Sequence, residues 1–283
     1  VSMAMPDNEV AIRIGFFFAV FVVVGFWEAI GARRTRSFSR VVRWPNNLAV
    51  VAADALLLRL MAPAGMIGIA VYAENAGFGL LNAVALPVWL AVLVSVVVLD
   101  LAIYVQHVLF HVVPALWRLH RMHHADLDFD VTTGFRFHPL EIALSLGIKM
   151  MVVAALGPPA VAVLIFEVLL NATSMFNHGN LRIGPAIDRI LRLFVVTPDM
   201  HRVHHSILPS ETNSNFGFSL PWWDRLFGTY VAQPADGHEG MEIGLDRFRD
   251  PGELRFDRMM LQPFRGDAGN HPINRRGGRE AGR

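Results

Sequence analysis

The 283-residue sequence contains no cysteine and only 17% charged residues. The absence of cysteine excludes disulfide bonds, cysteine-ligated zinc, iron–sulfur clusters and thiol catalysis. A typical soluble domain has about 25% charged residues, so the composition argues against a disordered chain and a soluble nucleic-acid-binding protein, and we expect no nucleic-acid partner. Only one of the 25 basic residues is a lysine, Lys149, and the net charge is +1. Charge is therefore informative only where it clusters locally.

Hydrophobic residues make up 53% of the chain and gather in long runs. A helix needs about 20 mostly apolar residues to cross a bilayer, and Ala11–Ile30, Leu48–Tyr72 and Leu81–Val105 are this long. The fourth run, Ile142–Phe176, has room for two shorter helices, and Gly-Pro-Pro at 157–159 predicts a tight turn between them. The run lengths favour an all-α, polytopic membrane bundle of about four membrane helices, including this hairpin, over a soluble bundle of buried helices.

Arginines are distributed unevenly between the predicted loops. Gly31–Asn47 carries five arginines, whereas Ala73–Leu80 carries no basic residue. Positively charged loops face the cytoplasm, so we expect the first loop inside and the second outside. The hairpin then leaves and re-enters the membrane from the inner side, which places Gln106–Glu141 and Asn177–Arg283 in the cytoplasm.

Two charged residues lie inside the predicted hairpin. Lys149 is eight residues before Gly157, and Glu167 is eight residues after Pro159. Folding at the turn places both at the same depth, about 12 Å from it at 1.5 Å per residue, and charges in the bilayer core are costly unless they are paired. We expect an ion pair between Lys149 and Glu167. In the alternative, Lys149 extends to an interface and Glu167 lines a substrate cavity.

The C-terminal part of the chain is less hydrophobic. Pro185–Val196 has apolar residues at helical spacing with arginines on the other side, which indicates a helix at the membrane interface or in a soluble core. From Phe264 the chain is rich in glycine and arginine, a composition typical of disorder. We therefore expect one integral membrane domain over residues 1–262 and a disordered tail over 263–283.

Ten of the twelve histidines form the main chemical signal. Residues i, i+3 and i+4 of a helix share one face, so an HxxxH pair can bind one ion and an HxxHH triple presents three imidazoles to one side. Ten imidazoles suit a centre of two ions better than one tetrahedral zinc, although imidazole binds Fe, Zn, Cu and Ni alike. The candidates are one HxxxH pair, two HxxHH triples and two single histidines: His107 and His111; His120, His123 and His124; His201, His204 and His205; His138 and His178.

The second HxxHH motif is followed by ETNSNFGFSLPWWDRLFGTY. Together with the HxxxH and first HxxHH motifs, this pattern over Leu81–Val231 resembles the fatty acid hydroxylase/sterol desaturase superfamily, in a bacterial type. The resemblance implies a membrane enzyme with two non-haem iron ions that uses O₂ to hydroxylate or desaturate a C–H bond of a sterol, fatty acyl or ether lipid. It implies ligand roles for the eight histidines of the three motifs and for His178. His138 matches an HPxE element, and its role as a ligand stays open because proline follows it.

The resemblance also implies partners and a location. Its members take electrons from an external donor, here a reductase, a ferredoxin or a cytochrome b5-like protein, and their lipid substrate from the bilayer. We expect the bacterial inner membrane, with the histidine site in a helical cap on the cytoplasmic side.

Two other functions compete with this interpretation. A haem-binding electron carrier would need histidines within the membrane spans, and none of the twelve lies mid-span. A metal-transport or metal-binding protein without oxidase activity would need polar groups along a path through the helices. His238 and His271 are isolated in polar sequence, so we expect them to be solvent-exposed and to serve neither role.

Polar residues near the histidines are candidates for orienting the imidazoles through hydrogen bonds. Asp100 lies seven residues before His107 and hence on the same face of its helix. Each of the others could instead cap a helix or stabilise a loop: Asp126, Asp199, Glu211, Asn213, Asn215 and Asp224.

Overall fold

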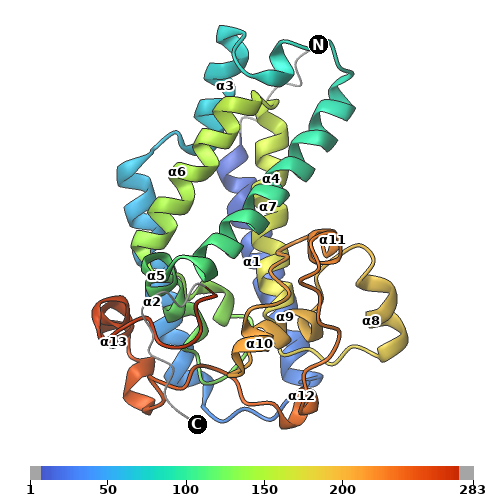
Figure 1. The fold of residues 1–283 in the computed structure, drawn as a ribbon. Coiled ribbons are helices and arrows are strands. Elements are labelled where there is room, and N and C mark those ends of the chain that lie inside the picture. Colours follow the sequence, from blue (N-terminus) through green and yellow to red (C-terminus); the bar gives the residue numbers. More distant parts are fainter. Residues whose placement is uncertain (1–7, 274–283) are drawn as a thin grey trace.

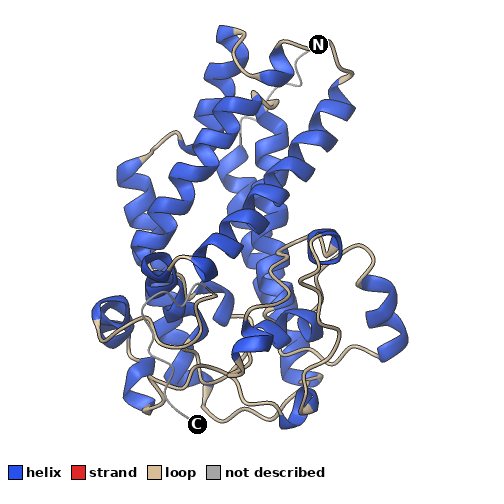
Figure 2. Cartoon of the chain, viewed as in Figure 1, coloured by secondary structure: helices blue, strands red, loops and turns tan. Residues whose placement is uncertain are grey.

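The computed structural model describes residues 8–273, which form helices and loops without a β-strand (Figure 2). The longer helices are α1 (Glu9–Ile30), α2 (Arg40–Met61), α3 (Gly65–Ala76), α4 (Val88–Val112), α5 (Pro114–His124), α6 (Pro139–Leu156) and α7 (Ala160–Asn177). The short helices are α8 (Pro185–Leu191), α9 (Pro198–His204), α10 (Pro209–Thr212), α11 (Trp222–Leu226), α12 (Gly237–Gly240) and α13 (Phe256–Leu261). Four 3₁₀ turns accompany them: η1 (Leu80–Asn82), η2 (Thr133–Phe135), η3 (Pro251–Leu254) and η4 (Gln262–Phe264).

Five segments of the described chain are long and apolar enough to cross a membrane. They are Glu9–Ile30, Arg40–Asn82, Val88–Val112, Pro139–Leu156 and Ala160–Asn177. The four predicted hydrophobic runs all recur among them, because the hairpin run folds into two helices. Many large apolar side chains of these helices are exposed, which suits contact with lipid. The prediction of an all-α membrane bundle is confirmed.

The hairpin of α6 and α7 turns at Gly157. This residue ends α6 with φ +63°, a left-handed conformation that favours glycine. A Cβ at this position would lie 2.6 Å from Asn82 Nδ2 and 2.6 Å from the carbonyl oxygen of Phe78. Pro159 then precedes the first turn of α7. The turn therefore packs tightly against the loop that follows α3.

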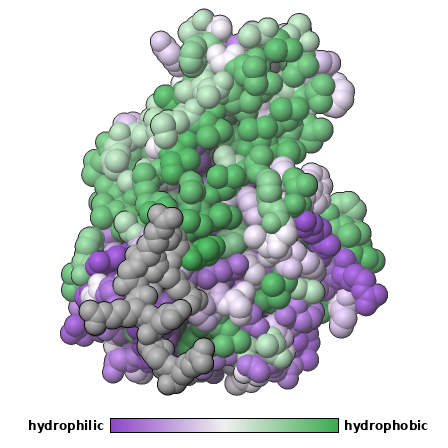
Figure 3. Space-filling model, viewed as in Figure 1, coloured by the Kyte–Doolittle hydropathy of each residue, from purple (hydrophilic) through white to green (hydrophobic). Residues whose placement is uncertain are grey.

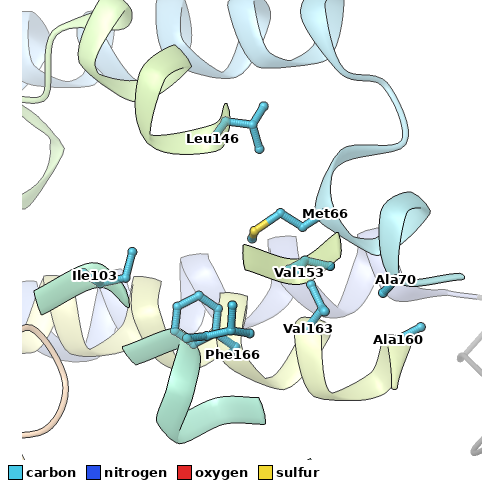
Figure 4. Packing of buried hydrophobic residues seen from close by; sticks show 9 residues of the cluster. Met66, Ala70, Ile103, Leu146, Val153, Ala160, Val163 and Phe166 are labelled. Atoms are coloured by element: carbon cyan, nitrogen blue, oxygen red, sulfur yellow. The ribbon is translucent and has the colours of Figure 1, made fainter. Parts of the chain in front are cut away.

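A hydrophobic core joins α3, α4, α6 and α7. Figure 4 shows Met66 of α3 beside Val153 of α6, with Val163 and Phe166 of α7 below them. Ile103 of α4 belongs to the same cluster, and all five side chains are buried. This packing fixes α4, which carries the HxxxH motif, against the hairpin.

The expected ion pair between Lys149 and Glu167 is wrong. Glu167 Oε2 instead lies 2.7 Å from Arg13 Nη1 of α1, and Lys149 forms no ion pair with it in the described part of the chain. Equal depth along a hairpin does not determine which helix faces meet. The packing of α1 on α7 supplies Arg13 as the partner.

The other end of α1 is held by Glu28, whose side chain is fully buried. Glu28 Oε1 accepts hydrogen bonds from the backbone N–H of Val131 (2.7 Å) and of Asn180 (2.8 Å). Arg40 Nη2 lies 3.1 Å from Glu28 Oε2. One carboxylate thus ties α1 to the loop after α5 and to the loop after α7.

The short helices form a cap at one end of the bundle (Figure 1). The cap and the loop 31–39 lie at this end, whereas α3 and the α6–α7 turn lie at the opposite end. Hydrophilic side chains gather on the cap, and apolar side chains cover the bundle above it (Figure 3). The predicted grouping of the arginine-rich loop with the histidine-bearing segments is therefore found.

The expectation of a disordered tail is wrong for residues 263–273, which pack against the cap. Trp117 Nε1 donates a hydrogen bond to the carbonyl oxygen of Ala268 (3.0 Å). The backbone N–H of Ile273 donates to the carbonyl oxygen of His111 (2.9 Å). Composition could not reveal these contacts, because they use the backbone of the segment. The rest of the predicted tail lies outside the described residues.

The segment Pro185–Val196 begins with α8, as its periodicity predicts. Its large apolar side chains point outward: Ile187, Ile190, Leu193 and Phe194 are all more than half exposed. A helix in a soluble core would bury these side chains, so the exposure favours the interfacial interpretation.

Candidate metal centre

Three helices bring the histidine motifs together. The last two turns of α4 carry His107 and His111, and Pro114 starts α5 almost immediately after α4 ends. Helix α5 carries the first HxxHH motif, and α9 carries most of the second. Thr197 caps α9, and its Oγ1 accepts a hydrogen bond from the backbone N–H of Met200 (3.4 Å).

Nine of the ten predicted ligands form two groups. The first group consists of His107, His111, His120, His124 and His204. The second group consists of His123, His178, His201 and His205. Within each group, one nitrogen of every ring lies within 4.8 Å of the others, and every ring is buried. His138 belongs to neither group.

Each HxxHH motif contributes to both groups. In α5 the i and i+4 histidines join the first group, and the i+3 histidine joins the second. In the motif on α9 the assignment is reversed. Each of the two helices therefore contributes ligands to both groups, so the groups form one centre.

Close approaches between ring nitrogens fit shared metal ions. Two nitrogens bound to one ion at about 2.0–2.1 Å lie roughly 2.8–3.4 Å apart for angles between 90° and tetrahedral. In the first group, His107 Nε2 lies 3.1 Å from His120 Nε2. In the second group, His178 Nε2 lies 3.1 Å from His123 Nε2 and 3.0 Å from His201 Nε2.

Five histidines use Nδ1 to donate a hydrogen bond to an oxygen. A proton on Nδ1 leaves the Nε2 lone pair free for a metal ion. The pairs are His107 with Phe216 O (2.8 Å), His111 with Asn213 Oδ1 (3.0 Å), His120 with Glu141 Oε1 (2.7 Å), His204 with Ser214 O (2.7 Å) and His178 with Ser174 O (2.8 Å).

Several other ring nitrogens are buried without a hydrogen-bond partner among the described residues. They are Nε2 of His111 and His204, Nδ1 of His123 and His201, and both nitrogens of His124 and His205. Buried polar atoms without partners are rare and costly. Coordination of metal ions would satisfy lone pairs of this kind, so the donor set fits two ions.

Burial keeps the cap histidines neutral. Desolvation of the charged form lowers the pKa of His120 and of His178 to about 3. The same cause lowers the pKa of the other histidines on α5 and of the motif on α9 well below the usual value. Imidazole must be neutral to bind a metal ion, so these rings are in the binding-competent state at neutral pH.

Glu141 is a site residue that the sequence analysis missed. It is 4% exposed, and its Oε1 accepts the hydrogen bond from His120. His138 instead caps α6, where its Nδ1 accepts a hydrogen bond from the backbone N–H of Leu140 (3.2 Å). The HPxE element was the available signal, and within it the glutamate rather than the histidine reaches the groups.

Among the predicted orienting residues, Asn213 alone contacts a grouped histidine, through His111. Asp224 acts on His107 indirectly, through the backbone at Phe216. Its carboxylate accepts hydrogen bonds from the backbone N–H of Phe216 (2.7 Å) and Gly217 (2.8 Å), and the carbonyl of Phe216 accepts from His107. Desolvation raises the pKa of Asp224 to about 6.

Asp100, a candidate for orienting His107, forms no direct hydrogen bond with it among the described residues. Asp100 Oδ2 accepts hydrogen bonds from Trp223 Nε1 (2.8 Å) and from the backbone N–H of Leu220 (3.2 Å). Two residues on one helical face can still reach different neighbours. Asp100 therefore ties α4 to the segment that enters α11.

The four remaining candidates bind groups other than the clustered histidines, so they stabilise the cap. Burial alone would raise the pKa of Asp126, but two arginines outweigh it and lower the pKa to about 2. The partners are Arg43 and Arg136 for Asp126, Arg33 and Arg202 for Asp199, the backbone of Ala235 for Glu211, and the backbones of Met200 and Val231 for Asn215.

The expectation that His238 and His271 are solvent-exposed is wrong. Both are buried, at 5% and 3% exposure. His238 lies 3.5 Å from Asp199 in the cap, and desolvation lowers its pKa to about 4. His271 stacks on Trp117 with 5.7 Å between ring centroids. Polar neighbours in sequence do not reveal burial produced by distant segments.

Fold and site together define a helical membrane protein whose cap holds two adjoining groups of buried histidines. Residues 92–229 match the fatty acid hydroxylase family, and this segment contains all nine grouped histidines. The match agrees with the resemblance seen in the motifs.

Curated relatives include an ornithine lipid hydroxylase from Rhizobium tropici, 31% identical over 150 residues that cover 52% of this chain and 44% of the relative. Alkylglycerol monooxygenase from Xenopus tropicalis is 27% identical over 167 residues, 57% of this chain and 35% of the relative. The Danio rerio enzyme of that name is 32% identical over 139 residues, 47% and 29% of the two chains. The chain thus spans less than half the length of these relatives. No solved structure matches it.

Proposed function

We propose that this protein is a membrane-bound, non-haem di-iron oxygenase that hydroxylates or desaturates a C–H bond of a lipid with O₂. The observation that carries the proposal is the pair of adjoining groups of five and four buried histidines at one end of a membrane bundle. The names of the relatives, an ornithine lipid hydroxylase and an alkylglycerol monooxygenase, support a lipid substrate.

In this proposal each histidine group holds one iron ion, and the bound ions supply the activation of O₂. The chain fixes the imidazoles around them. Glu141 keeps the proton of His120 on Nδ1, and Asn213 does the same for His111. The carbonyl oxygen of Phe216 plays this part for His107. These hydrogen bonds would leave the Nε2 atoms of the three rings free to bind an ion.

The reaction needs an external reductant. Hydroxylation converts RH, O₂, two electrons and two protons into ROH and H₂O, and desaturation converts the same reactants into an alkene and two H₂O. A reductase, a ferredoxin or a cytochrome b5-like protein would deliver the electrons to the hydrophilic cap. The lipid chain would approach from the apolar bundle (Figure 3).

We further propose that the protein lies in a bacterial inner membrane with its cap in the cytoplasm. The arginine-rich loop at the cap end supports this orientation. Reporter fusions after Arg40 should show a cytoplasmic location, and fusions within 73–80 should show the opposite side. The reverse result would contradict the orientation.

The function is tested by loading the full chain with Fe(II) under anaerobic conditions, adding a chemical reductant and membrane lipids, and then admitting ¹⁸O₂. Mass spectrometry should detect an ¹⁸O-hydroxylated or a desaturated lipid with the wild type and not with His204→Ala. A metal-transport protein would move metal without changing the lipids. Unchanged lipids with a fully iron-loaded wild type would overturn the oxygenase proposal.

A further inference from the structure

Residues 262–273, which we call the C-terminal strap, lie outside the segment that matches the family. The strap runs along α5, the helix that supplies histidines to both groups. Its contacts with α5 are made largely by backbone carbonyl oxygens of the strap. The side chains that donate to these carbonyl oxygens show which part of α5 the strap holds in place.

The first anchor of the strap is Arg121 of α5. Its guanidinium is fully buried and donates hydrogen bonds to the carbonyl oxygens of Gln262 (2.5 Å), Arg265 and Asp267. A buried charged donor is costly without acceptors, and the strap supplies three. Arg118 Nε adds a hydrogen bond to the carbonyl oxygen of the strap residue Pro263 (2.8 Å).

The second anchor is Trp117, which is 1% exposed. Its Nε1 donates to the carbonyl oxygen of Ala268 (3.0 Å), and its ring stacks on the ring of His271. The other neighbours of this indole include His111 and His124 of the first group, with ring centroids 4.8 Å and 5.3 Å away. Trp117 therefore contacts both the strap and the first group.

The strap also reaches His111 by hydrogen bonds. Asn213 Nδ2 donates to the carbonyl oxygen of His271 (2.6 Å), while Asn213 Oδ1 accepts from His111 Nδ1 (3.0 Å). The backbone N–H of Ile273 donates to the carbonyl oxygen of His111 (2.9 Å). His111 is thus held through its side chain and its backbone, and both connections lead to the strap.

We propose that the C-terminal strap positions the first metal group, acting on His111 through Asn213. None of the hydrogen bonds described above goes to a histidine of the second group. The inference rests on the proposed function, because it requires each group to bind an ion. The strap residues touch neither metal nor substrate in this account, so their role is positioning rather than catalysis.

A specific effect on metal affinity follows. The strap fixes the amide of Asn213 with its oxygen toward His111, and so keeps the His111 proton on Nδ1. Loss of a hydrogen-bond partner of a metal-ligating histidine typically weakens metal binding about 10–100-fold. Releasing the strap should therefore weaken the first ion by this factor and leave the second ion unchanged.

The test is a calorimetric Zn²⁺ titration of the metal-free full chain in detergent, in which the wild type should bind two ions. Arg121→Gln, which releases the strap, and Asn213→Ala, which breaks its link to His111, should each weaken one of the two ions. The double variant should weaken binding by less than the sum of the two single changes, because both changes act on His111 through Asn213. Trp117→Phe keeps a ring against His271 and should give a smaller shift in the same direction.

Matched controls are Arg258→Gln, an exposed arginine of α13, and Asn171→Ala, whose side chain donates a hydrogen bond within its own helix to the carbonyl oxygen of Glu167. Both should leave the two binding steps unchanged. Equal weakening of both ions by Arg121→Gln, or no weakening by Trp117→Phe and Arg121→Gln, would overturn the strap proposal while the proposed function stands. A wild type that binds fewer than two ions would contradict both proposals.

Discussion

The two histidine groups are held in the protein to different degrees. In the first group, four of the five rings donate a hydrogen bond from Nδ1 to a protein oxygen. In the second group, His178 does so, whereas Nδ1 of His123, Nδ1 of His201 and both nitrogens of His205 have no hydrogen-bond partner in the described chain. Both groups consist of histidines, but more rings of the first group are held by a hydrogen bond to a protein oxygen.

This difference predicts that the two ions bind with different strengths. Hydrogen bonds behind the ligands fix ring orientation and raise metal affinity, so we expect the first ion to bind more tightly and in one geometry. The second group has one ligand fewer and fewer constraints. Catalytic metal sites keep an open coordination position, and the second group is better suited to provide it.

The largest expected effect comes from removing one ligand of each group. His204→Ala should remove the first ion and His205→Ala the second, and each should lower lipid oxidation by a factor of roughly 100 or more because the ions act as a unit. Iron content per chain and product formation measure the result. Full activity of His204→Ala would refute the two-ion centre, and loss of the same ion in both variants would refute the division into groups.

A smaller effect is expected at Glu141, which supports only the first group. Glu141→Gln keeps an oxygen acceptor for His120 but replaces the carboxyl group with an amide, so the first ion should bind about 10–100-fold more weakly. The second ion should be unaffected in a metal titration. Glu242→Gln, at an exposed carboxylate of the cap, is the control. Equal weakening of both ions would remove the contrast between the groups.

Acid should destabilise the metal-free protein. The pKa of His120 and of His178 is about 3 in the folded chain and about 6.5 when unfolded. Below pH 6.5 the unfolded state therefore binds more protons, and stability falls by up to about 1.4 kcal/mol per pH unit for each such histidine. Thermal unfolding between pH 7 and pH 4 measures this. Unchanged stability over that range would show that the rings are not buried in their neutral form.

The same acid titration compares the groups when metal is present. Protons compete with metal for imidazole, so the less constrained second group should release its ion at the higher pH. Metal analysis after dialysis at each pH gives the order of release. Release of the first ion at the higher pH would reverse the assignment of the tighter site.

The smallest effect is expected at His138, which lies outside both groups. His138→Ala removes the side-chain cap of α6, and lost caps cost about 1 kcal/mol of stability. Thermal unfolding should shift slightly, and both ions should remain. Loss of an ion from this variant would show that His138 is a ligand after all.

The fold was predictable where it depends on local sequence. Hydrophobic run length and the Gly-Pro-Pro turn predict the membrane helices and the hairpin. The partner of Glu167 was not predictable, because Arg13 comes from a helix more than 150 residues away in sequence. The order in residues 263–273 was hidden for the same reason, since its backbone binds side chains of α5.

The candidate site was likewise predictable only where it depends on local sequence. Helical spacing brought the histidines of the motifs together, because i, i+3 and i+4 share a face. It could not assign the two groups, since each HxxHH helix contributes to both and the assignment depends on how α5 and α9 are rotated. Glu141 and the carbonyl of Phe216 escaped notice because a hydrogen-bond acceptor opposite Nδ1 is defined only by tertiary structure.

The attachment of α1 has a consequence for assembly. Glu28 is fully buried, and one of its backbone donors, Asn180, lies 152 positions later in the chain. At a translation rate of about 5–20 residues per second, this donor follows Glu28 by roughly 8–30 s. Helix α1 therefore cannot complete the hydrogen bonds of Glu28 until the segment after α7 has been made. Of the described helices, α1 is made first and yet is among the last to reach its final place.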